Sequence, residues 1–195
     1  MKDGIALILL ADGFEETEAV VPADVLRRAG KKVITAGISG KIVTGAHGIP
    51  VIADCTWEEI KNEKIDCLIL PGGMPGTKNL DLSPVTNEAI ASTLKNDGRL
   101  AAICAAPSVY GKRNLLSGKK ATCYPSFERF LIGAGYVNAP VDTTSSTMHT
   151  FLPLIRFTSW RERYRRCSLP VVIEEAMGTS MPSCMYNFLL FLATA

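Results

Sequence analysis

Cys104 is the residue of this chain whose type and surroundings point most directly to chemistry. It follows the apolar run 100–103, which predicts a buried strand, and a helical pattern starts directly after it at Ala105. A thiol at such a turn faces the positive end of a helix dipole, which favours the nucleophilic thiolate. The small side chains of Ala105 and Ala106 permit a sharp turn that projects the sulfur. The alternative is that Cys104 is one more small buried thiol.

Two further features could act with this thiol. The strand predicted at 67–70 runs into Gly72-Gly73, whose backbone N–H groups could bind an anion or a developing oxyanion, although such a sequence is also found in ordinary turns. Glu18 lies in the acidic segment after the first strand. A buried carboxyl tends to keep its proton and can then donate a hydrogen bond to a thiolate. The alternative for Glu18 is a helix-N-terminal glutamate favoured by the dipole.

The elements that position these residues alternate between short apolar runs and helical patterns. The runs predict strands at 5–10, 32–36, 51–53, 67–70, 100–103 and 121–123, and the helical patterns cover 15–30, 57–61, 83–96 and the segment from 105. This alternation indicates β-α-β units and an α/β fold, doubly wound, with a mostly parallel sheet and helices on both faces. Sites in such sheets form at the carboxyl ends of strands, where Cys104, Gly72-Gly73 and the acidic segment all fall.

The composition excludes several classes of function. The chain has 195 residues, of which 47% are hydrophobic and 21% are charged, with a net charge of +2. These values suit one globular domain and give no case for binding nucleic acid or an anionic membrane. No apolar run reaches the roughly 18 residues of a membrane span, and the N-terminus does not have the pattern of a signal peptide. We therefore expect a cytoplasmic protein.

The cysteine and histidine content argues against a metal centre. Six cysteines and two histidines are present, and no two cysteines form a Cys-x-x-Cys pair. We expect no metal, and we expect the cysteines of a cytoplasmic chain to be thiols.

Several segments resemble the DJ-1/ThiJ/PfpI superfamily, on its DJ-1 (ThiJ-like) branch. They are residues 11–18 (ADGFEETE), 70–76 (LPGGMPG) and 101–107 (AAICAAP), supported by 22–30 (PADVLRRAG) and 118–125 (GKKATCYP). The resemblance covers the chain in order from residue 5 to about 140. It implies a single flavodoxin-like domain over 1–195, with a family-like part at 1–140 and a divergent segment at 141–195. It also implies a homodimer.

The resemblance gives roles to particular residues. It implies that Cys104 is the reactive cysteine of a nucleophile elbow and Glu18 its protonated partner. The pocket residues that we infer are Gly72, Gly73 and Ala105 for the oxyanion, with Tyr124 and Glu16 as further candidates.

The implied activity needs no cofactor and acts on small reactive aldehydes. In this glyoxalase III/deglycase type of chemistry, which includes the conversion of methylglyoxal to lactate, the thiolate adds to an aldehyde carbon and Glu18 moves the protons. The alternative is a non-enzymatic oxidative-stress sensor or redox-responsive chaperone, in which peroxide oxidises the same thiolate. PfpI-type proteases carry a histidine directly after the cysteine. Ala105 stands there, which argues against proteolysis.

The chain departs from the DJ-1 pattern in three places. Tyr124 precedes Pro125 where DJ-1-type proteins often have a histidine, and a pocket arginine of some members has no match nearer than His47, for which we prefer a surface-loop assignment. After residue 141 the strand, turn and long helix that end the family are missing. All 11 lysines lie at or before Lys120, and an arginine cluster follows at 156–166, for which we prefer a solvated basic face. We hypothesise that this segment derives from a changed reading frame or an alternative exon.

Overall fold

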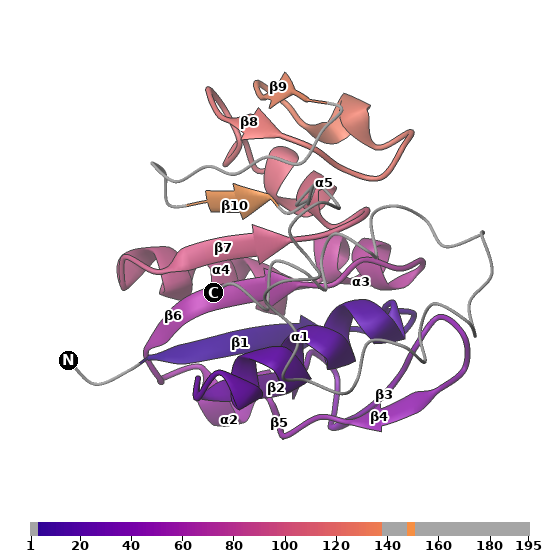
Figure 1. Ribbon diagram of the computed structural model, residues 1–195, viewed down its shortest axis with the longest axis vertical. Helices are drawn as coiled ribbons and strands as arrows, with labels where there is room; N and C mark the ends of the chain where they lie inside the picture. The colour runs from indigo at the N-terminus through magenta and orange to yellow at the C-terminus, as the bar shows by residue number, and fades with distance from the viewer. Residues whose placement is uncertain (1–3, 138–147, 151–195) are drawn as a thin grey trace, which may run out of the picture.

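The chain folds around a six-stranded sheet in which all neighbouring strands are parallel (Figure 1). A computed structural model describes residues 4–137 and 148–150. The strand order is β10-β7-β6-β1-β2-β5. The strands are β1 (Ile5–Leu10), β2 (Val33–Gly37), β5 (Cys55–Thr56), β6 (Ile65–Leu70), β7 (Arg99–Ala102) and β10 (Met148–Thr150). The predicted α/β fold with a parallel sheet is confirmed.

The central strands are buried on both faces, as their continuous apolar runs predict. In β1, Leu7 and Leu9 pack into one hydrophobic cluster, whereas Ile8 and Leu10 pack into a second cluster on the opposite face. Side chains alternate between the faces of a strand, so a run without polar residues fits only a sheet that is covered on both sides.

Helices cover the two faces unequally. α1 contributes Ala19 and Ala23 to the cluster on one face, and it lies in front of the sheet in Figure 1. The other face is covered by α2, α3, α4 and α5, among whose buried residues are Trp57, Ile90 and Tyr110. The helices are α1 (Glu16–Arg28), α2 (Trp57–Ile60), α3 (Gly76–Leu82), α4 (Pro84–Lys95) and α5 (Pro107–Gly111), and a short 3-10 helix, η1, spans Glu128–Phe130.

Two of the predicted strands lie outside the main sheet. β4 (Pro50–Ile52) pairs in antiparallel fashion with β3 (Ile42–Thr44), and β8 (Lys120–Ala121) pairs with β9 (Gly135–Tyr136). In β4, Pro50 and Ile52 are exposed, so this strand has no second buried face to offer the central sheet. Both segments contain short strands, as predicted, but a short apolar run does not specify its partner strand.

The helix after Cys104 starts later and is shorter than predicted. Residues 104–106 form a turn, and α5 begins at Pro107 and spans only five residues. Proline has no N–H and is pre-organised for the first turn of a helix, which accounts for this start. The short helix weakens the dipole argument for a thiolate at Cys104, because a macrodipole needs a longer run of aligned peptides.

Much of the segment predicted to diverge lies outside the described residues. Residues 138–147 and 151–195, which include Cys167, Cys184 and the arginine cluster, are not described. β10 is the described part of this segment, and it extends the sheet beside β7. Within residues 4–137 and 148–150, no helix has the length and apolar character needed to cross a membrane.

Candidate functional site

Cys104 stands at a strained turn between β7 and α5. Its φ angle is +60°, a conformation that costs a residue with a Cβ roughly 1–2 kcal/mol. Its carbonyl accepts a hydrogen bond of 2.7 Å from the Tyr124 amide, and the Ala106 amide donates to the Ile103 carbonyl at 3.0 Å. The side chain of Cys104 is half-buried. Backbone strain of this kind persists only where the surroundings hold it, and it presents the sulfur at the carboxyl end of the sheet.

Glu18 is the acidic partner of this thiol. It lies in the first turn of α1 and is only 3% exposed. Its Oε2 accepts a hydrogen bond of 2.8 Å from the Gly72 amide, and its carboxyl group is also hydrogen-bonded to the Cys104 side chain. Three segments that are distant in the sequence therefore meet at one carboxyl group. They are the end of β6, the end of β7 and the start of α1.

The environment of Glu18 makes protonation easy near neutral pH. Burial is the largest influence, and with the nearby charge of Glu15 it raises the pKa of Glu18 from 4.5 to about 7. The hydrogen bonds from Gly72 and Cys104 act in the opposite direction and are outweighed. A carboxyl group with this pKa can both give and take a proton at physiological pH.

The loop after β6 fits closely against the elbow. A Cβ added to Gly72 would lie 2.7 Å from the Cys104 Cβ and 2.7 Å from Glu18 Oε2, so only glycine leaves room here. Gly73 has a φ of +89°, and a side chain there would collide with the Glu15 amide. Because the Gly72 amide already donates to Glu18, the amides of Gly73 and Ala105 are the candidates that remain for an oxyanion.

Two predicted pocket residues take different positions. Tyr124 is beside the elbow through its backbone, and its side chain is 43% exposed. Glu16 is buried and binds the hairpin loop: its carboxylate accepts hydrogen bonds from the His47 amide at 2.8 Å and from His47 Nδ1 at 2.9 Å. The Glu16 carboxylate also accepts backbone hydrogen bonds from Glu16 itself and from Ile49, whereas the hydrogen bond to the Cys104 thiol is made by Glu18.

The contact between Glu16 and His47 favours the charged form of both groups. Burial opposes ionisation of Glu16, but the hydrogen bonds from His47 outweigh it, and the pKa of Glu16 is lowered. The hydrogen bond to Glu16 and the charges of Glu15 and Glu16 raise the pKa of His47. Donor atoms of Glu15, Glu16 and His47 lie within 4.8 Å of one another. An ion pair accounts for this arrangement without a metal.

Glu15 also contacts the candidate site, although the sequence did not single it out. Its charge helps to raise the pKa of Glu18, and its amide donates to the Gly72 carbonyl at 2.9 Å. The repeated glutamates at 15, 16 and 18 were the available signal, since a third carboxylate beside a buried pair affects their protonation.

The other described cysteines are thiols that favour the protonated state. Cys55, Cys67 and Cys123 are free, as predicted. Burial is the main cause that raises the pKa of all three, to about 12 for Cys67 and Cys123. Deprotonation at neutral pH is therefore disfavoured at these positions.

Comparison with known proteins establishes the family to which this chain belongs. The sequence pattern of the DJ-1/PfpI family matches residues 5–181. The chain belongs to this family, as its resemblance predicted.

Relatives from animals and plants agree with this assignment. Protein dj-1beta of Drosophila melanogaster is 39% identical over 128 residues, which are 65% of this chain and 68% of the fly protein. Protein DJ-1 homolog B of Arabidopsis thaliana is 45% identical over 186 residues, which are 88% of this chain but 42% of the plant protein. The chain thus spans less than half the length of the plant relative. The crystal structure of the fly protein has a TM-score of 0.69 at 34% identity and covers 76% of this chain and 81% of its own.

Two relatives have names that describe an activity. A Caenorhabditis elegans protein named glutathione-independent glyoxalase is 36% identical over 132 residues, covering 67% of this chain and 70% of that protein. A Pyrococcus abyssi protein named deglycase is 32% identical over 151 residues, covering 75% and 89%.

Proposed function

We propose that this chain is a cofactor-independent enzyme that acts on small reactive aldehydes, converting methylglyoxal to lactate through Cys104 and Glu18. The observation that carries the proposal is the hydrogen bond between the Cys104 thiol and a buried carboxyl group whose pKa is about 7. Relatives named glyoxalase and deglycase support the same class of substrate.

In the proposed reaction, the proton of the thiol passes to Glu18 and the sulfur adds to the aldehyde carbon. The resulting alkoxide takes the proton back from Glu18 and becomes a hemithioacetal. Glu18, now a carboxylate, removes the hydrogen on the former aldehyde carbon and leaves an enediolate. The hydroxyl proton of the enediolate moves to the neighbouring oxygen, and Glu18 returns its proton to the neighbouring carbon. This leaves a thioester of lactate, and water cleaves it to lactate and the free thiol. The amides of Gly73 and Ala105 would stabilise the oxyanions.

The test is turnover of methylglyoxal to lactate by the wild type and by single variants. We expect Cys104→Ser to lose all detectable turnover, because an alcohol with an ordinary pKa is a poor nucleophile. Cys55→Ser is the matched control, since Cys55 is a half-buried thiol outside the elbow, and it should retain wild-type turnover. Equal turnover by wild type and Cys104→Ser would disprove the proposal.

A second function, peroxide sensing by the same cysteine, is favoured by one observation. Cys104 is half-buried, whereas burial raises the pKa of the other three described thiols, Cys55, Cys67 and Cys123, so peroxide would select Cys104 among the described thiols. Sulfinic acid at Cys104 under mild peroxide, without any methylglyoxal turnover, would favour the sensor over the enzyme.

We also infer the setting in which the protein works. The free thiols at Cys55, Cys67 and Cys123 suit the reducing cytoplasm. A homodimer is supported by exposed apolar surface on the hairpin, where Ile42 and Ile52 are directly opposite each other in β3 and β4.

A further inference from the structure

The two loops of the site each lead into a short helix. The Gly72-Gly73 loop runs into α3 at Gly76, and the Cys104 turn runs into α5 at Pro107. Because Gly72 and Cys104 lie so close that a single methyl group would not fit between them, a small relative movement of α3 and α5 would change the contacts of the sulfur. Something must therefore fix these two helices to each other.

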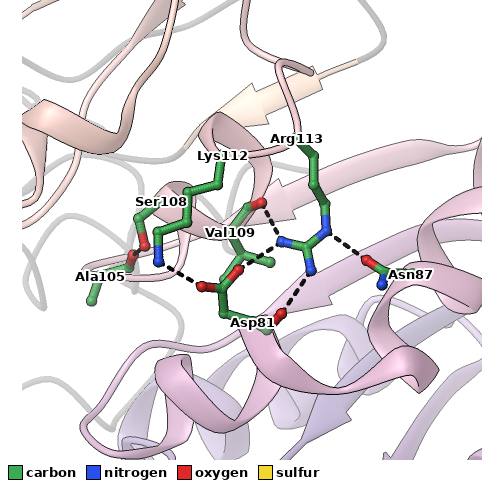
Figure 2. Close-up of polar contacts among 7 residues, drawn as sticks. All are labelled: Asp81, Asn87, Ala105, Ser108, Val109, Lys112 and Arg113. Carbon is green, nitrogen blue, oxygen red and sulfur yellow. Dashed lines mark hydrogen bonds and ion pairs between the residues drawn. The ribbon is translucent and has the colours of Figure 1, made fainter.

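Arg113 and Asp81 join the far ends of the two helices (Figure 2). Arg113 follows α5, and Asp81 is the next-to-last residue of α3. Arg113 Nη1 donates to Asp81 Oδ1 at 2.8 Å and Nη2 donates to the Asp81 carbonyl at 2.8 Å. The same guanidinium donates through Nε to Asn87 of α4 at 2.7 Å and through Nη1 to the Val109 carbonyl of α5 at 2.7 Å. One planar group thus connects three helices.

Charge and burial make this contact more than a surface ion pair. The Asp81 and Arg113 side chains are only 16% and 20% exposed, and Lys112 Nζ binds the second carboxylate oxygen of Asp81. Burial opposes ionisation of Asp81, but the hydrogen bonds from Lys112 and Arg113 outweigh it and lower its pKa. Arginine stays charged at any physiological pH, and its five donors have a fixed geometry that lysine cannot reproduce.

The contact is connected back to the elbow through α5 itself. Ser108 Oγ donates to the Ala105 carbonyl at 2.6 Å, directly after Cys104, as Figure 2 shows. The buried Tyr110 hydroxyl donates to the Ala101 carbonyl of β7 at 3.2 Å, three positions before Cys104. A five-residue helix has little stability of its own, so its position depends on such tertiary contacts.

We propose that Asp81 and Arg113 are positioning residues, which fix the Cys104 sulfur relative to the Gly72-Gly73 loop by holding α5 against α3. The inference rests on the proposed function, because it concerns the same thiol. Its consequence is that damage to the Asp81–Arg113 contact changes the chemistry of a sulfur that neither side chain touches.

The experiment measures Cys104 directly in Arg113→Lys and Asp81→Asn. The rate of Cys104 alkylation is followed against pH by mass spectrometry, and kcat and KM for methylglyoxal are determined in parallel. We expect the apparent pKa of Cys104 to shift and kcat to fall about tenfold with little change in KM, since misplacement of about 1 Å can cost up to a hundredfold in rate. Arg113→Lys tests geometry, because it keeps the charge and loses the planar group.

Two controls separate positioning from loss of stability. Ile60→Val removes a buried methyl group from α2, on an element without site residues, and lowers stability without touching the contact. Lys41→Met removes the ion pair with Glu59, whose nitrogen and oxygen are 2.9 Å apart. Both should keep the wild-type alkylation profile. Asp81→Glu retains the charge with one more methylene. We expect it to keep more thermal stability than Asp81→Asn but not the wild-type profile of Cys104 alkylation.

The outcomes for the two proposals are distinct. A wild-type Cys104 that alkylates as an ordinary thiol and gives no turnover contradicts the proposed function. A reactive wild-type Cys104 whose alkylation profile and kcat are unchanged in folded Arg113→Lys and Asp81→Asn contradicts the positioning role alone. An Ile60→Val variant that shifts the alkylation profile as much as Arg113→Lys and Asp81→Asn would also contradict the positioning role.

Discussion

Glu18 and Cys104 are two acids joined by a hydrogen bond, so in the proposed reaction one proton moves between the carboxyl group and the sulfur. While that proton is on the sulfur, the site cannot attack an aldehyde. When it moves to Glu18, the thiolate and a neutral acid are formed together without a net charge change in a buried space. This exchange explains why a carboxyl group is useful beside a nucleophilic sulfur, whereas a second permanent negative charge would oppose the thiolate.

Glu18→Gln is predicted to stabilise the protein at alkaline pH while it abolishes turnover. The folded state holds the Glu18 proton up to a pKa of about 7, against 4.5 for an ordinary glutamate, so it binds more protons than the unfolded state between these values. The free energy of unfolding therefore falls as pH rises through this window, and the loss reaches about 3 kcal/mol above it. Glutamine has no proton to lose and can still accept the Gly72 hydrogen bond.

The measurement is urea unfolding of wild type and variant at pH 5 and pH 8. The free energy of unfolding of Glu18→Gln, taken relative to that of the wild type, should be up to about 3 kcal/mol higher at pH 8 than at pH 5. Glu58→Gln, at an exposed position paired with Lys61, serves as the control and should show no such gain. A stability difference between Glu18→Gln and wild type that does not change with pH would show that Glu18 is ionised normally.

The hairpin formed by β3 and β4 is attached to the loop before α1 by several contacts. The Gly13 amide donates to the Thr44 carbonyl at 2.8 Å and the Ala46 amide donates to the Phe14 carbonyl at 2.8 Å. His47 adds a contact to Glu16, which lies two residues before Glu18. The hairpin thus supports the segment that carries Glu15 and Glu18.

His47→Asn is predicted to weaken this attachment most at mildly acidic pH. The raised pKa of His47 means that its stabilising contribution is complete below 6.5 and is lost as pH rises through the folded pKa. The lowered pKa of Glu16 means that its contribution is complete above 4.5 and is lost as pH falls through its folded pKa. The wild type should therefore exceed the variant most clearly near pH 5.5. Asparagine keeps a donor but cannot become charged.

Hydrogen exchange at the Ala46 amide, compared between wild type and His47→Asn, measures this effect. The ratio of protection factors should be largest near pH 5.5 and approach one by pH 9. If protection differs equally at both pH values, the pair contributes through its hydrogen bond alone and not through the charge of His47.

The core of the fold could be predicted because its determinants are local. The run Ile5–Leu10 has no polar residue, and only a strand covered on both faces satisfies it. The hairpin and the β8–β9 pair could not be placed, because two- or three-residue strands take their partners from tertiary contacts. The late start of α5 depended on Pro107, a helix-starting residue that was visible in the sequence.

The site was predictable where topology alone brings residues together. Strands β6 and β7 are neighbours, so the Gly72-Gly73 loop and Cys104 had to meet at one edge of the sheet. Which of two nearby glutamates faced the sulfur was not determined by spacing. The Arg113–Asp81 contact, whose partners are 32 positions apart in the sequence, left no local pattern.

The exposed apolar surface of the β3–β4 hairpin is where we expect two copies of the chain to associate. Ile42 is 72% exposed and Ile52 is 77% exposed, and the two residues are register partners in β3 and β4. A two-fold axis near this pair would bury both side chains against their copies, because a symmetric dimer uses the same surface twice.

Lysine at either position would bring like charges together across the axis. We expect Ile42→Lys and Ile52→Lys to be monomers by size-exclusion chromatography with light scattering, while the wild type is a dimer. Ile132→Lys, which changes an exposed isoleucine outside the hairpin, should remain dimeric. A dimer that tolerates both hairpin substitutions would place the contact on another surface, and a monomeric wild type would contradict the dimer itself.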